Sequence, residues 1–125
     1  MSEIIKVKRI FQKLAEEEHK IRSKYAGKEE YADEEAGELA ELYNKFDKKF
    51  KKHGLEVELY DVDEDFIEST QYCSWYIIRS TYIVTVKSTG KRYRAKTKID
   101  RFVYPQGYIG YANPRCDVWE DDEDP

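Results

Sequence analysis

Apolar residues recur every three or four positions along two successive stretches of the chain, which is the spacing of one helix face. The pattern predicts a helix over residues 3–25, with the polar Glu18 inside its apolar stripe, and a second helix over residues 31–53. Gly27 and Gly54 follow the two stretches and are typical of helix ends. Because the break between the stretches is short, we expect an antiparallel helical hairpin. The apolar stripes consist of Ile4, Val7, Phe11, Leu14, Ile21 and Tyr25, then Ala32, Ala36, Leu39, Leu42, Tyr43, Phe46 and Phe50.

The period changes to two after Gly54. Apolar and polar residues alternate over residues 55–60, which predicts a half-buried strand. Residues 61–70 are acidic, and we expect a loop or one short helical turn there. Residues 72–87 are rich in aromatic and β-branched side chains and predict a long strand. Residues 91–99 predict the return strand, and a further strand or two is expected within residues 101–112.

The turn between the two long strands contains Thr89 and Gly90. A two-residue turn at this point predicts one hairpin register, and a three-residue turn with a left-handed Gly90 is the alternative. In both cases four basic residues share one side of their strand, because strand side chains alternate. The two-residue turn pairs Val86 with Tyr93, Val84 with Ala95 and Tyr82 with Thr97. The basic residues are Arg92, Arg94, Lys96 and Lys98.

Helices followed by consecutive strands predict an α+β fold, in which the N-terminal antiparallel helical hairpin packs on a four- to five-stranded antiparallel sheet. The arrangement of elements resembles cystatin-like or NTF2-like layouts, as an analogy of arrangement alone. A chain of 125 residues has the size of one domain. We assign residues 1–115 to that domain and residues 116–125 to an acidic C-terminal tail.

The net charge of −4 hides a strong segregation of charge along the chain. Residues 55–73 contain seven acidic residues and no basic one, whereas residues 74–115 contain nine basic residues and one acidic one. Residues 116–125 contain six acidic residues and no basic one. The predicted sheet is therefore basic, and acidic segments border it on both sides in sequence.

The first functional hypothesis is that the acidic segments dock on a basic site of a protein partner. Complementary fields speed encounter and select the partner, and an exposed tryptophan would add an apolar anchor. The chain would then be a non-enzymatic regulator or inhibitor of the nucleic-acid-mimic kind, and its compact, tyrosine-rich composition suits a phage or mobile-element protein. The candidate residues are Asp61, Asp63, Glu64, Asp65, Trp119, Asp121 and Asp122.

The alternative is a module that binds single-stranded nucleic acid through the basic strand face, with an aromatic ring beside the basic row. The acidic tail would cover this face when ligand is absent. The sequence pI of about 5.3 weighs against this alternative, because such domains are usually basic. In a third interpretation, the basic face is only solvated and its charge is offset by nearby carboxylates. The candidate nucleic-acid-binding residues are Trp75, Arg79, Lys87, Arg92, Arg94, Lys96 and Lys98.

Motifs for catalysis and for metal binding are missing from the sequence. His19 and His53 fall on separate predicted helices, and no phosphate-binding glycine loop is present. We therefore predict no enzymatic activity, no cofactor and no metal, and an enzyme would require a pocket with convergent polar groups. Cys73 and Cys116 are expected to be free thiols of a cytoplasmic protein, and no membrane partner is predicted. The identity of the partner and the oligomeric state stay open.

Overall fold

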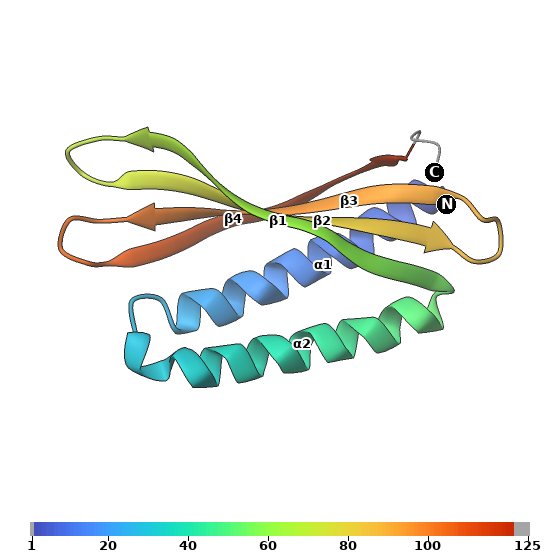
Figure 1. The fold of residues 1–125 in the computed structure, drawn as a ribbon, viewed down its shortest axis with the longest axis horizontal. Helices are drawn as coiled ribbons and strands as arrows, with labels where there is room; N and C mark the ends of the chain where they lie inside the picture. The colour runs from blue at the N-terminus through green and yellow to red at the C-terminus, as the bar shows by residue number, and fades with distance from the viewer. Residues whose placement is uncertain (1, 122–125) are drawn as a thin grey trace.

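A computed structural model of the chain describes residues 2–121 and has two helices on one side of a four-stranded antiparallel sheet (Figure 1). The α+β fold class predicted from the sequence is confirmed, with four strands in the order β1-β2-β3-β4. A short 3₁₀ turn, Glu29–Tyr31, joins the helices. The elements are α1 (Glu3–Lys24), α2 (Ala32–Lys52), β1 (Leu55–Ser69), β2 (Ser74–Val86), β3 (Arg92–Val103) and β4 (Ile109–Glu120).

The helices begin and end where the sequence pattern predicts, to within a residue. The Ser2 hydroxyl accepts a hydrogen bond from the Ile5 amide at 3.4 Å and so caps the start of α1. Gly27 and Gly54 follow the helices with φ angles of +71° and +70°, which favour glycine. The helices lie antiparallel beneath the sheet, and α1 runs under β3 and β4 (Figure 1).

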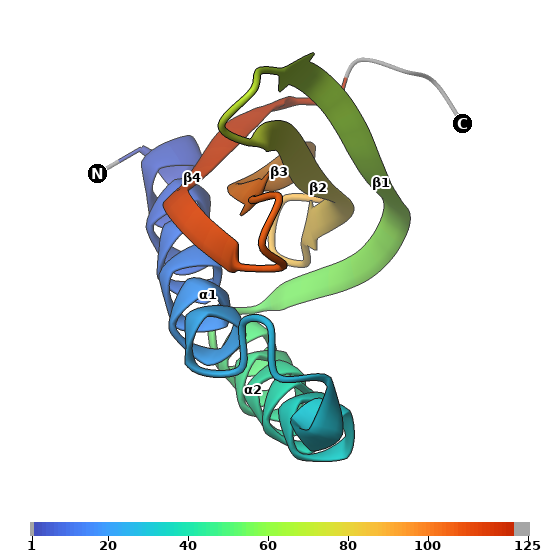
Figure 2. The ribbon, with the colours of Figure 1, turned by 90° about the vertical axis from the view of Figure 1, so that its left-hand side faces the viewer.

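Only part of the sheet is covered by helix. The strands twist strongly, so that β4 lies beside α1 while β1 swings away from both helices (Figure 2). In the C-terminal half of the α2 apolar stripe all residues but Tyr43 are buried, whereas Ala32 and Ala36 of the first turns are exposed. The buried residues of α2 are Leu42, Phe46 and Phe50. Much of β1 therefore has no helix packed against it.

The core centres on Phe11 of α1, which is fully buried. Its ring stacks on Phe50 of α2 with a centroid distance of 5.2 Å and contacts Tyr82 of β2 at 5.1 Å. Val84 and Ala95 form the floor of the core on the sheet, and both have no exposed surface. One aromatic side chain thus joins both helices to the centre of the sheet.

The predicted loop at residues 61–70 is wrong, because β1 continues as a strand to Ser69. A β-bulge at Tyr60 explains the error, since the register with β2 shifts between Leu59 and Asp61. Before the bulge the odd-numbered residues of β1 face the helices, and from Val62 to Phe66 the even-numbered residues do, until a second register shift between Phe66 and Glu68. The alternation in the sequence therefore breaks at Tyr60, although the strand does not.

The predicted tail is wrong for residues 116–120, which form the second half of β4. Here too a bulge hides the strand: the register with β3 shifts around Asn113, whose φ is +54°. Cys116 is buried beneath α1, and its thiol donates to the Lys8 carbonyl oxygen at 3.4 Å. Both cysteines are free. The rest of the predicted tail, residues 122–125, lies outside the described residues.

The predicted β2–β3 register is wrong by two residues. Val84 lies opposite Tyr93, and Tyr82 lies opposite Ala95. The Val86 amide donates to the Lys91 carbonyl oxygen at 2.8 Å across a four-residue turn, and Gly90 has the left-handed φ of +73°. A shift of two residues preserves the faces of a strand. The prediction that the four basic residues of β3 share one side is therefore confirmed.

We predict that Phe11→Ala lowers the free energy of unfolding by about 3–5 kcal/mol, because it leaves a cavity between both helices and the sheet. The measurement is urea denaturation followed by circular dichroism. The matched control is Ile5→Ala on the same helix, where the side chain is 46% exposed and the loss should be within about 1 kcal/mol. Equal losses in the two variants would contradict this description of the core.

Candidate protein-binding edge of the sheet

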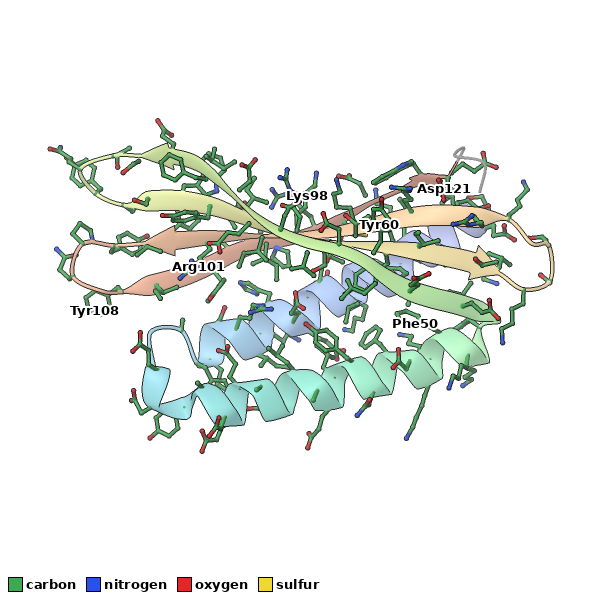
Figure 3. The ribbon with its side chains drawn as sticks, in the orientation of Figure 1. Phe50, Tyr60, Lys98, Arg101, Tyr108 and Asp121 are labelled. Atoms are coloured by element: carbon green, nitrogen blue, oxygen red, sulfur yellow. The ribbon has the colours of Figure 1, made fainter. Side chains whose placement is uncertain are left out.

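The sheet face that points away from the helices, here called the outer face, carries charges sorted by strand. Basic side chains project from the two central strands, from Arg79 on β2 and from the row on β3. Acidic side chains project from the two edge strands, β1 and β4. Figure 3 shows Lys98, Tyr60 and Asp121 on this face, on the opposite side of the sheet from Phe50.

Ion pairs between strands connect the acidic edges to the basic centre. From β1, Asp63 Oδ1 lies 2.8 Å from Arg79 Nε, and Asp65 lies 3.3 Å from the same guanidinium. From the other edge, the Lys98 ammonium donates to Asp117 of β4 at 2.8 Å. These contacts raise the pKa of Arg79, through its hydrogen bond to Asp63, and lower the pKa of Asp117.

Asp121 closes the other end of the basic row. Its carboxylate lies 3.5 Å from the Arg92 guanidinium and 3.3 Å from Arg94, and the side chain is only 2% exposed. Aromatic rings complete the coverage, with Arg94 4.8 Å from the ring centroid of Tyr60 and the ammonium of Lys96 5.7 Å from that of Trp119. Asp121, which the sequence suggested for partner binding, thus forms ion pairs with arginines of its own fold.

The candidate nucleic-acid-binding residues do not form one accessible basic surface. Trp75 stacks on Phe102 at 6.1 Å, at the opposite end of the β2–β3 pair from Lys87 in the turn after β2. Arg79 and the β3 residues Arg92, Arg94 and Lys98 contact carboxylates of their own sheet. This geometry favours the interpretation in which neighbouring carboxylates offset the basic charge.

The candidate acidic residues divide into two groups. In the first group, Asp63 and Asp65 form ion pairs with Arg79. Glu64 points to the helix side and accepts a hydrogen bond from Arg101 at 2.7 Å. Asp61 is exposed and forms no ion pair with any residue in the range 2–121. Trp119 is partly exposed on β4, and Asp122 lies outside the described residues.

Two further carboxylates on β1 join Asp61. Glu56 and Glu58 are exposed, face outward opposite Thr85 and Ile83, and form no ion pair within the described part of the chain. Both residues lie on the polar side of the half-buried strand predicted from the sequence, and the pattern alone assigns them no function. Their alternation with Val57 and Leu59 in the sequence predicts a strand, but it does not show that this strand lies at the edge of the sheet.

An apolar groove runs along the helix-facing side of the same segment. Between the edge strand β1 and α2 lies a partly open cavity of about 340 Å³. Leu59 and Val62, which line it, are 54% and 57% exposed. Its other lining residues are Leu14, Arg22, Tyr43, Phe46, Asp47, Phe50, Val57, Ser80 and Tyr82.

Polar groups at the inner end of this groove come from both helices. The Tyr43 hydroxyl donates to Glu18, which is buried, and Arg22 lies 3.8 Å from the same carboxylate. Burial raises the pKa of Tyr43 and raises that of Tyr82 to about 12, so both phenols stay neutral near pH 7. The carboxylate that interrupted the α1 stripe in sequence is thus satisfied inside the fold.

The exposed apolar surface is concentrated on β1. Of the twelve large apolar side chains that are exposed within residues 2–121, β1 contributes five. These are Leu59, Tyr60, Val62, Phe66 and Ile67. An edge strand that presents apolar residues beside unpaired carboxylates is a surface suited to binding another chain.

Within residues 2–121, no three His, Cys, Asp or Glu side chains are grouped so that they could hold a metal ion. No described helix has the length and apolar character needed to span a membrane. No protein-family model matches the chain, and no curated protein or solved structure shows significant similarity to it.

We predict that Lys98→Met raises the pKa of Asp117, because the ammonium stabilises the ionised carboxylate. A carboxylate with a lowered pKa in the folded state stabilises the fold at neutral pH, and this contribution is lost as pH falls through that pKa. The pKa is measured by NMR titration of the carboxyl carbon. Lys91→Met, at an exposed lysine that contacts Glu120 instead, is the control and should leave the pKa of Asp117 unchanged.

Proposed function

We propose that this protein is a non-enzymatic binding module that docks on a protein partner through the acidic, apolar edge of β1. The observation that carries the proposal is the alternation along residues 56–62, where exposed carboxylates face outward and exposed aliphatic side chains face the groove. The carboxylates are Glu56, Glu58 and Asp61, and the exposed aliphatic residues are Leu59 and Val62, with the half-buried Val57 beside them.

The charge supports a basic partner. The three carboxylates form no ion pair among the described residues, whereas Asp63, Glu64 and Asp65 farther along β1 are paired within the sheet. Unpaired carboxylates attract a basic surface over about one Debye length, roughly 8–10 Å at ordinary salt. A partner bound at this edge would have its basic surface covered without any chemical reaction, as it would be by a regulator or an inhibitor.

The test is site-specific photo-crosslinking in cells that naturally express the chain. A photo-reactive amino acid at Leu59 should crosslink to a protein partner, whereas the same amino acid at Tyr31, which is exposed beside α2, should not. Glu56→Lys, Glu58→Lys and Asp61→Lys in combination should reduce the Leu59 crosslink about tenfold, since rim and edge charges set the rate and selectivity of encounter.

A matched variant controls for the change in net charge. Glu29→Lys, Glu30→Lys and Glu41→Lys alter the same number of exposed carboxylates on the helical side of the molecule and should leave the crosslink intact. Thermal unfolding of both triple variants confirms that each is folded. Equal crosslinking in the two variants, or no crosslink at Leu59, would rule out the proposed function.

A further inference from the structure

The backbone of β1 has one free side. Only β2 pairs with it, so the backbone groups that point away from β2 are available to another extended chain. Natural peptide-binding domains use such edges: the backbone hydrogen bonds provide affinity, and alternate side chains provide specificity. The side chains of β1 therefore specify what kind of strand would fit beside it.

Each face of β1 sets a different requirement for an added strand. On the outer face, the side chains of the added strand would lie beside Glu56, Glu58 and Asp61, and basic groups at those positions would be favoured. On the helix side they would lie over Leu59 and Val62 and enter the groove of about 340 Å³. A matching strand alternates basic and apolar residues.

A second copy of β1 does not meet this requirement. Residues 55–69 contain no Lys or Arg, and every outward charge between residues 56 and 65 is negative. Two copies paired edge to edge would place carboxylates beside carboxylates, which destabilises a strand pair. The charge pattern therefore disfavours self-pairing at this edge and favours a basic segment of another protein.

We infer that the partner contributes an extended segment in which Lys or Arg alternates with aliphatic residues, and that this segment adds to β1 as a fifth strand. The inference rests on the proposed function and specifies its binding mode. The segment of β1 from Glu56 to Val62 is seven residues long, or roughly 20 Å at about 3.3 Å per residue. A partner strand of ordinary length is sufficient to cover it.

The experiment uses the purified full chain and fluorescent peptides of about nine residues. In the first peptide lysine alternates with valine, and in the second the same residues are grouped as a lysine block and a valine block. The alternating peptide should bind at least about tenfold more tightly than the block peptide, and raising the salt concentration should weaken it. N-methylation of alternate amides, on the side that faces β1, should abolish the binding, because it removes the backbone donors.

Two sets of variants test the two faces separately. Glu56→Lys, Glu58→Lys and Asp61→Lys should reduce affinity for the alternating peptide at least about tenfold, and so should Leu59→Ser with Val62→Ser. The control variant with lysine at residues 29, 30 and 41 should bind as the wild type does. Since all of these side chains are exposed, the variants are expected to fold.

The possible results separate the binding mode from the function. Equal affinity for the two peptides, or retained binding after N-methylation, would overturn the fifth-strand inference. If the alternating peptide fails to bind while the Leu59 crosslink to a partner persists, the strand-addition mode is wrong and the proposed function stands. Loss of both signals overturns both proposals.

Discussion

Ion pairs between neighbouring strands allow the two central strands of this sheet to carry so much positive charge. Arg79 and Lys98 are direct cross-strand neighbours, and two like charges at such positions destabilise a strand pair. Each obtains a counter-ion from the outer strand on its own side, Arg79 from Asp63 and Lys98 from Asp117. The acidic edges and the basic centre are thus mutually dependent, which explains why charges of one sign follow one another along the chain.

The same arrangement divides β1 into two functionally different halves. Beyond the bulge at Tyr60, most of its carboxylates neutralise Arg79 and Arg101 within the fold. Around and before the bulge, Glu58 and Asp61 have no such partner in the described structure, and α2 leaves an apolar groove beside them. Counting acidic residues does not distinguish the halves, whereas the position of each carboxylate relative to the central strands does.

The sequence predicted those features that depend on local periodicity. The helices, their glycine stops and the common face of the β3 basic row follow from spacings of three to four and of two. The register of β2 against β3 was wrong by two residues because alternation fixes only the face of a strand. The second halves of β1 and β4 were missed because bulges at Tyr60 and Asn113 reverse the alternation. Of the proposed site, Asp61 was identified from charge alone, but the groove depends on where α2 packs, which no local pattern shows.

The bulges also determine where the length of this chain can change. Tyr60 is an extra residue opposite β2, so a chain that lacked it would keep Asp61 opposite Thr81 and every later side chain on its present face. Removing a residue elsewhere in a regular part of the strand would turn all the following side chains over. Homologues that differ by one residue should therefore differ at the bulges. In a homologue that lacks the residue at position 60, apolar and polar residues would alternate without a break from Leu55 to Asp63.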